Sequence, residues 1–144
     1  MSPEENLRSD ITFFCDWNFP CKMFQALIKM GFRIECLHHH IPQNASDDLV
    51  IQFVASSGWV LVTGDDAIRR KHIPALVEHK PIVIFFSPSV SQMRIEEKKA
   101  WLIENWPKVA KEAGTLIQGE MMGVSKSLAF RRYPPPKLKQ PRQG

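Results

Sequence analysis

The sequence predicts an α/β protein in which helices cover a central, mainly parallel sheet, giving three layers. Three short apolar runs, at residues 11–16, 59–63 and 81–86, have the pattern of strands that are buried on both faces. Segments with apolar residues at helical spacing separate these runs. The alternation of strand and helix is typical of parallel sheets joined by right-handed crossovers, and the fold class follows from it.

Length and composition favour one domain followed by a tail. The chain has 144 residues, of which 44% are hydrophobic, and this is enough for one substantial core. We therefore expect a single domain over residues 1–130. From Arg131 onward the sequence is basic and rich in proline, so residues 131–144 are predicted to form a flexible tail.

Charge and cysteine content narrow the class of protein. A net charge of +4 permits contact with a polyanion such as nucleic acid without requiring it. Cys15, Cys21 and Cys36 lack the spacing of a zinc site, which favours buried thiols in a reducing compartment. No apolar run is long enough to cross a membrane, and the acidic start does not resemble a signal peptide. We expect a cytoplasmic protein that does not contact membranes.

The first half of the chain has clear helix signals. A helix is expected from Pro20 to Gly31, followed by a strand over residues 32–37 near an edge of the sheet, because apolar and polar residues alternate there. Residues 46–48, Ser-Asp-Asp, can cap a second helix, which Gly58 ends.

The second half is less regular. Residues 65–70 are expected to form a turn or short helix, and residues 92–113 carry the longest helical pattern, which Pro107 would normally kink or interrupt. Residues 115–118 and 125–130 are predicted to form a short hairpin.

Several carboxylates fall at the carboxyl edge of the predicted sheet. Asp16 follows the first strand, Asp47 or Asp48 begins the second helix, Asp65 follows the third strand, and Asp66 is a fourth candidate. Neighbouring strands lie about 4.8 Å apart, so Asp16 and Asp65 are close enough to share one hard cation. Carboxylate oxygens are the ligands that Mg²⁺ or Mn²⁺ prefers, so the pattern predicts a metal site suited to phosphodiester hydrolysis.

Each aspartate also has a purely structural interpretation. Asp47 and Asp48 can cap a helix, Asp65 and Asp66 can cap the next one, and Asp16 can bond its own backbone in a turn. Three carboxylates that lie close together repel each other without a cation, and this favours the metal interpretation for the set.

The motifs in this chain resemble those of PIN-like domains of the VapC-related group. Residues 16–20, Asp-Trp-Asn-Phe-Pro, look like the motif that opens these domains. Residues 46–48 and 60–65 look like the second and third motifs, in the same order and with the same spacing. The resemblance covers residues 11–113.

The resemblance implies a magnesium-dependent ribonuclease, often the toxin of a toxin–antitoxin pair. The carboxylates that it assigns to catalysis and metal binding are Asp16, Asp47 and Asp65, to which position adds Asp66 as a metal ligand. The supporting residues are Asn18, Thr63 and Asp48. Trp17 and Ala67 stand where the family often has acidic residues, so a noncatalytic module remains an alternative.

Other features bear on substrate binding. The residues that follow the acidic edge are expected to bind RNA phosphates, although a solvated helix face explains them equally well. They are Arg69, Arg70, Lys71 and His72. Residues 38–40, three histidines, favour a substrate-facing or solvated loop over a zinc site, because consecutive side chains point to alternating sides. Trp101 and Trp106 are expected in the core or an interface.

The leading hypothesis is therefore a metal-dependent endoribonuclease with an RNA substrate, paired with an antitoxin protein, and a homodimer is left open. Its rival is a noncatalytic PIN-like module that binds RNA or protein. A phosphoacceptor receiver domain is disfavoured, because it needs an acidic pair after the first strand and a lysine after the last, whereas Asp16-Trp17 and Phe86-Ser87 stand there.

Overall fold

A six-stranded sheet forms the centre of the molecule. The computed structural model describes residues 11–16, 21–42, 44–65 and 67–138. The strand order is β2-β1-β3-β4-β5-β6; all neighbours are parallel except the antiparallel pair β5 and β6. The strands are β1 (Thr12–Cys15), β2 (Arg33–Cys36), β3 (Val60–Thr63), β4 (Ile82–Phe86), β5 (Met121–Val124) and β6 (Phe130–Tyr133). The predicted α/β class with a mainly parallel sheet is confirmed.

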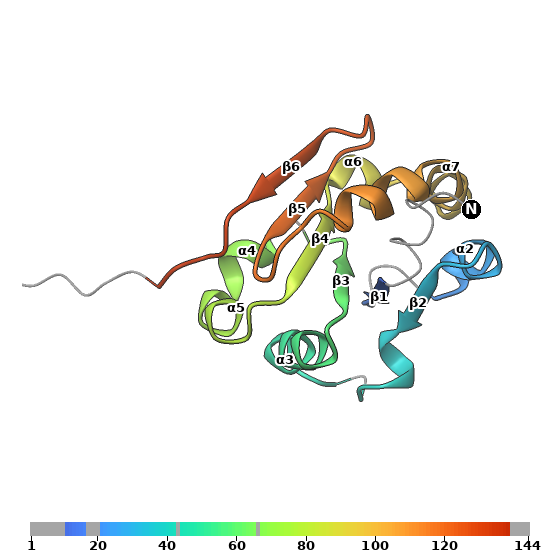
Figure 1. Ribbon diagram of the computed structural model, residues 1–144. Coiled ribbons are helices and arrows are strands. Elements are labelled where there is room, and N and C mark those ends of the chain that lie inside the picture. The colour runs from blue at the N-terminus through green and yellow to red at the C-terminus, as the bar shows by residue number, and fades with distance from the viewer. Residues whose placement is uncertain (1–10, 17–20, 43, 66, 139–144) are drawn as a thin grey trace, which may run out of the picture.

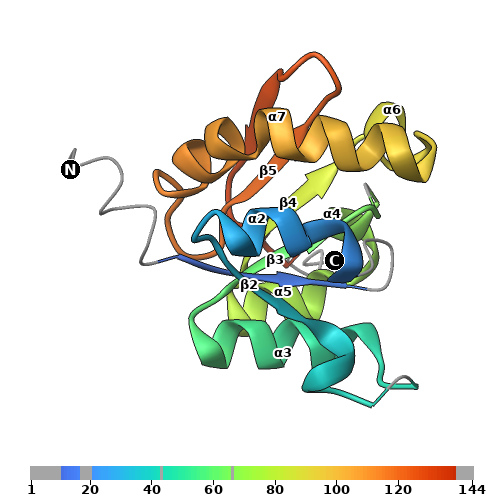
Figure 2. The ribbon, with the colours of Figure 1, turned by 90° about the vertical axis from the view of Figure 1, so that its right-hand side faces the viewer.

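Helices cover both faces of this sheet, which gives three layers (Figures 1 and 2). One face carries α2 (Gln25–Lys29), α6 (Pro88–Ser91) and α7 (Ile95–Ala113), and the other carries α3 (Asp47–Ser57), α4 (Ile68–Lys71) and α5 (Ile73–His79). Two short 3-10 helices, η1 (Cys21–Phe24) and η2 (Leu37–His39), precede α2 and follow β2.

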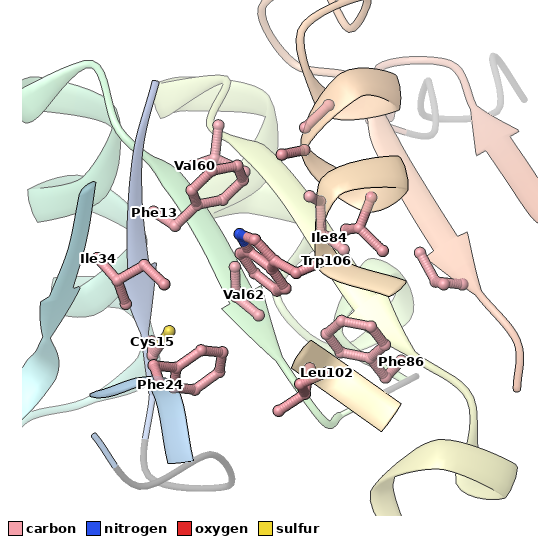
Figure 3. Packing of buried hydrophobic residues seen from close by; sticks show 14 of the residues in the cluster. Phe13, Cys15, Phe24, Ile34, Val60, Val62, Ile84, Phe86, Leu102 and Trp106 are labelled. Carbon is pink, nitrogen blue, oxygen red and sulfur yellow. The ribbon is translucent and has the colours of Figure 1, made fainter. Parts of the chain in front are cut away.

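The core is divided by the sheet into two hydrophobic clusters. Alternate strand residues supply each cluster: Phe13 and Val62 face the α7 side, whereas Phe14 and Leu61 face the α3 side. Trp106 of α7 is fully buried at the centre of the first cluster (Figure 3). Its ring lies 4.9 Å from that of Phe13 in an edge-to-face arrangement. Trp101 is also buried, so the expectation for both tryptophans is confirmed.

Local signals fix α3 and hence the edge of the sheet at which it begins. The Ser46 hydroxyl accepts a hydrogen bond from the Leu49 N–H at 3.2 Å and caps the helix. Gly58 ends it with a φ of 70°, which glycine adopts without strain. Because α3 leads directly into β3, its start lies at the carboxyl edge of the parallel strands, beside the ends of β1 and β3.

Other elements differ from the sequence prediction. Two short helices, α5 and α6, were not predicted. Pro107 lies within α7 without ending it. The predicted hairpin exists, but its strands are β5 and β6 rather than residues 115–118 and 125–130, and β6 extends into the basic segment as far as Tyr133.

The two cysteines whose state the structure describes differ from each other. Cys15 is a buried free thiol, whereas Cys36 is disulfide-bonded, so the expectation of free thiols is wrong for Cys36. Among the residues described, no helix has the length and apolar character needed to span a membrane.

Candidate functional site

Two aspartates follow neighbouring strands at the carboxyl edge of the sheet. Cys15, the last residue of β1, is in register with Val62 of β3. The Asp16 N–H donates to the Val62 carbonyl at 3.2 Å, so the backbone of Asp16 is held against the end of β3. Asp65 lies two residues beyond Thr63, where β3 ends. The topology therefore brings Asp16 and Asp65 to adjacent positions on one edge.

Asp65 is held by contacts on its backbone and on both carboxylate oxygens. Its N–H donates to the Thr63 hydroxyl at 3.1 Å, and its Oδ1 accepts from the Ala67 N–H at 3.0 Å. The Lys71 ammonium lies 3.2 Å from Oδ2. The fully buried Thr63 thus contacts the residue that the sequence predicted it to support, and Lys71 neutralises the carboxylate.

Asp47 and Asp48 both contact His72. They occupy the first turn of α3, where the helix dipole favours negative charge. His72 Nε2 lies 3.0 Å from Asp47 Oδ2, and His72 Nδ1 lies 3.2 Å from Asp48 Oδ1. The sequence singled out His72 as a residue that grips phosphates, but its contacts with Asp47 and Asp48 were not predicted.

Lys71 and His72 are consecutive, so one short segment contacts both acidic groups. Lys71 ends α4 and His72 precedes α5. Asn18 and Asp66, which were also predicted to belong to the site, lie outside the described residues. Within the described part of the chain, no three His, Cys, Asp or Glu side chains form a group that could hold a metal. The predicted metal ligands therefore stay a prediction.

The thiol of Cys15, which is buried next to Asp16, is unreactive. Burial, and to a smaller extent the negative charge of Asp16, raise the pKa of Cys15 well above its ordinary value. The side chain remains a neutral thiol at neutral pH, and this excludes a role as a thiolate nucleophile.

The predicted RNA-binding cations have different surroundings. The guanidinium of Arg69 lies 4.2 Å from the centroid of the Tyr133 ring, and Arg70 is exposed on α4. Lys71 differs from both because it pairs with Asp65. Lys71 is thus part of the acidic edge, whereas Arg69 packs on the aromatic side chain of β6.

The histidine run does not gather around one point. The side chain of His38 lies outside the described residues, and His39 is exposed. The His40 ring packs near those of Phe53 and Trp59, with centroids 5.6 and 5.4 Å away. His40 Nε2 also lies 3.7 Å from Glu35 Oε1. These contacts agree with a surface loop packed on aromatic residues.

The fold and the strand-end aspartates define the class as an α/β domain with an acidic carboxyl edge. A family model described as a PIN-like domain matches residues 11–88, more than half of the chain. The protein belongs to the PIN-like domain family. The match spans β1 to β4 and ends at the start of α6, so α7, β5 and β6 lie beyond it. Searches of curated proteins and of solved structures gave no significant match.

Proposed function

We propose that the protein is a metal-dependent endoribonuclease that hydrolyses RNA phosphodiester bonds, with Asp16 and Asp65 as its central carboxylates. The observation that carries the proposal is the placement of these two residues after neighbouring strands, in a chain that belongs to the PIN-like family. Ligands of open α/β sheets bind at this edge.

The chemistry of the donors suits Mg²⁺ or Mn²⁺, because carboxylate oxygens are hard ligands. Such an ion, when bound, polarises the scissile phosphate and favours attack by water. A metal at Asp65 has to compete with the Lys71 ammonium for Oδ2. Asp47 would join the site only if it exchanged its contact with His72 for the metal.

The other residues of the chain would position the reactants. Thr63 holds the backbone of Asp65, and Ala67 holds its Oδ1 through an N–H, so the carboxylate is fixed before substrate arrives. Arg69 and Arg70 on α4 offer cations for the substrate phosphates next to this carboxylate. A role as the toxin of a toxin–antitoxin pair rests on the resemblance of the sequence motifs alone.

Cleavage of a labelled single-stranded RNA tests the proposal. Purified wild-type protein should cleave it in Mg²⁺ and not in EDTA, and Asp16→Asn or Asp65→Asn should abolish cleavage without changing the thermal unfolding transition. Glu104→Gln removes an exposed carboxylate on α7 and serves as the matched control. Cleavage that persists in both aspartate variants would refute the proposal.

A noncatalytic binding module is the second candidate. Lys71 contacts Asp65, and His72 contacts Asp47 and Asp48, so three of the four described acidic candidates have side-chain partners within the protein. This alternative predicts RNA or partner binding that Asp16→Asn and EDTA leave unchanged, with no cleavage.

The toxin role has a test of its own. It predicts that the neighbouring gene encodes a small antitoxin-like protein. The product of that gene should bind this protein and block cleavage.

A further inference from the structure

A cavity of about 340 Å³ lies beside the acidic edge, between α4 and the hairpin of β5 and β6. We call it the arginine pocket. Its polar lining comes from Arg69, Arg70, Arg131, Tyr133, Ser87 and Ser125. Three of these side chains are cations, and no carboxylate is among the residues that line it. The pocket is therefore suited to an anion with about the volume of a small organic phosphate.

One donor in the pocket lacks a partner. The Nε of Arg69 is buried and has no hydrogen-bond acceptor among the described residues. A buried N–H without an acceptor destabilises the folded protein. Because this Nε is enclosed by protein, a phosphate oxygen satisfies it only if the Arg69 side chain moves on binding, after which the guanidinium can bind phosphate through two parallel N–H groups.

The Tyr133 ring positions this guanidinium. Arg69 stacks on the ring at 4.2 Å, and Arg131, two residues earlier on the same face of β6, lies 6.0 Å from it. The Phe85 ring supports Tyr133 at 5.7 Å. Arg132, between them in sequence, points to the other face of the sheet and contacts Glu112. Strand alternation therefore places Arg131 and Tyr133 together on the pocket side.

One end of the pocket reaches the same edge of the sheet as Asp65, whereas Tyr133, in register with Met121 at the start of β5, lies towards the other edge. Ser87 follows β4, the neighbour of β3, and Ser125 follows β5, the next strand along. At about 4.8 Å per strand, the two serines lie one and two steps from the end of β3. A chain bound at Asp65 can therefore continue into the arginine pocket along this edge.

We propose that the arginine pocket binds a backbone phosphate of single-stranded RNA, next to the bond positioned at Asp16 and Asp65. The choice of RNA rests on the proposed function, whereas the preference for phosphate follows from the pocket itself. Tyr133 acts here as a positioning residue for Arg69. Six of the ten lining residues come from the hairpin of β5 and β6, which lies beyond the residues matched by the family model.

Binding of a fluorescent ten-nucleotide RNA, measured by anisotropy in EDTA, tests the pocket without any cleavage. We expect the double variant Arg69→Gln/Arg131→Gln to bind roughly tenfold more weakly, because it cannot form two charge-assisted hydrogen bonds to phosphate. The slope of log Kd against log salt should fall by about 0.7 for each phosphate that the variant no longer neutralises. Lys108→Gln, on α7 at the opposite face, removes one exposed cation and should leave both quantities unchanged.

Variants of Tyr133 separate positioning from charge. Tyr133→Phe keeps the ring and should bind like the wild type, whereas Tyr133→Leu should bind several-fold more weakly with no change in net charge. If a variant of Arg69 or Arg131 fails to fold by circular dichroism, Arg70→Gln tests the pocket instead, since Arg70 is exposed. Unchanged affinity in every folded pocket variant would overturn the inference.

The source of the phosphate is tested by competition. Inorganic phosphate and adenosine monophosphate should displace the RNA only at concentrations far above the Kd of the oligonucleotide, and displacement at a comparable concentration would contradict a strand-binding role. If the wild-type protein cleaves no RNA but the arginine variants bind RNA more weakly, the proposed endoribonuclease activity is refuted and the proposed phosphate-binding role of the pocket is supported.

Discussion

The ammonium of Lys71 lies 3.2 Å from Oδ2 of Asp65, the carboxylate that follows the fully buried strand β3. Both groups are partly exposed, so solvent weakens the attraction and the pair remains exchangeable. A metal bound through this oxygen, as proposed, would therefore have to displace the Lys71 ammonium.

Replacing Lys71 should strengthen metal binding. In Lys71→Gln the Asp65 carboxylate loses its positive neighbour, so we expect Mn²⁺ to bind several-fold more tightly, as measured by calorimetry or electron paramagnetic resonance. Lys108→Gln is the control for the loss of one positive charge. Equal Mn²⁺ affinity in the wild type and Lys71→Gln would argue that Asp65 is not a metal ligand.

Replacing Ser46 should destabilise the start of α3. Ser46→Ala removes the acceptor for the Leu49 N–H and should lower the free energy of unfolding by about 1 kcal/mol, as urea denaturation can measure. Ser46→Asp keeps an acceptor and should stay close to the wild type. Ser57→Ala, at the other end of α3, is the control. A Ser46→Ala variant as stable as the wild type would show that the cap is energetically unimportant.

Trp106 offers a test of core packing. Its Nε1 is buried and has no hydrogen-bond partner in the described part of the chain. Trp106→Phe removes this unsatisfied donor, which partly offsets the loss of volume, so we expect a cost of about 1–2 kcal/mol. Trp106→Ala should cost about 3–5 kcal/mol by leaving a cavity. Similar unfolding free energies for the two variants would contradict this account.

Because Lys98 is buried, the free energy of unfolding should depend on pH in the alkaline range. Burial lowers its pKa below the ordinary 10.5, so above the folded-state pKa the unfolded chain binds more protons than the folded one. Stability then rises with pH up to about the unfolded pKa. We expect the wild type to gain stability relative to Lys98→Met as pH increases from 8 to about 10.5 in urea titrations. Comparing the two proteins cancels the other titrating groups, and a constant difference would contradict the prediction.

The sequence was most informative where a residue's role is local. The strands around Phe14, Leu61 and Ile84 are buried on both faces, so continuous apolar runs marked them. Ser46 and Gly58 bounded α3 through backbone preferences that need no tertiary contact. The adjacency of Asp16 and Asp65 followed from parallel strands alone.

Elements that depend on tertiary contacts were missed. β5 contains Met121, Met122 and Gly123, which have little intrinsic preference for a strand, and it forms because it fills the space between β4 and β6. α7 continues through Pro107 although the proline has no N–H to donate to the carbonyl of Ile103, one turn earlier.

In the candidate site, too, local features could be predicted from the sequence, whereas tertiary contacts could not. Candidate acids could be found from position in the sequence, but their counter-ions could not, because the contacts of Lys71 and His72 depend on how α4 and α5 fold back over the sheet. Nothing in the sequence distinguishes Lys71 from the adjacent Arg70. The sequence prediction assigned Tyr133 and Arg131 to a tail, because a basic, proline-rich stretch resembles a disordered one. In the structure both residues belong to β6, which pairs with β5.

β6 also bears on solubility. As the outer strand of the described sheet, it presents backbone hydrogen-bonding groups that another protein molecule could extend into a longer sheet. Arg131 and Arg132 occupy its middle, so antiparallel pairing of two such strands would bring like charges together across the new ladder. The same arginine that faces the pocket therefore helps to keep the molecules from aggregating edge to edge, and neutralising both arginines should lower the concentration at which the protein precipitates.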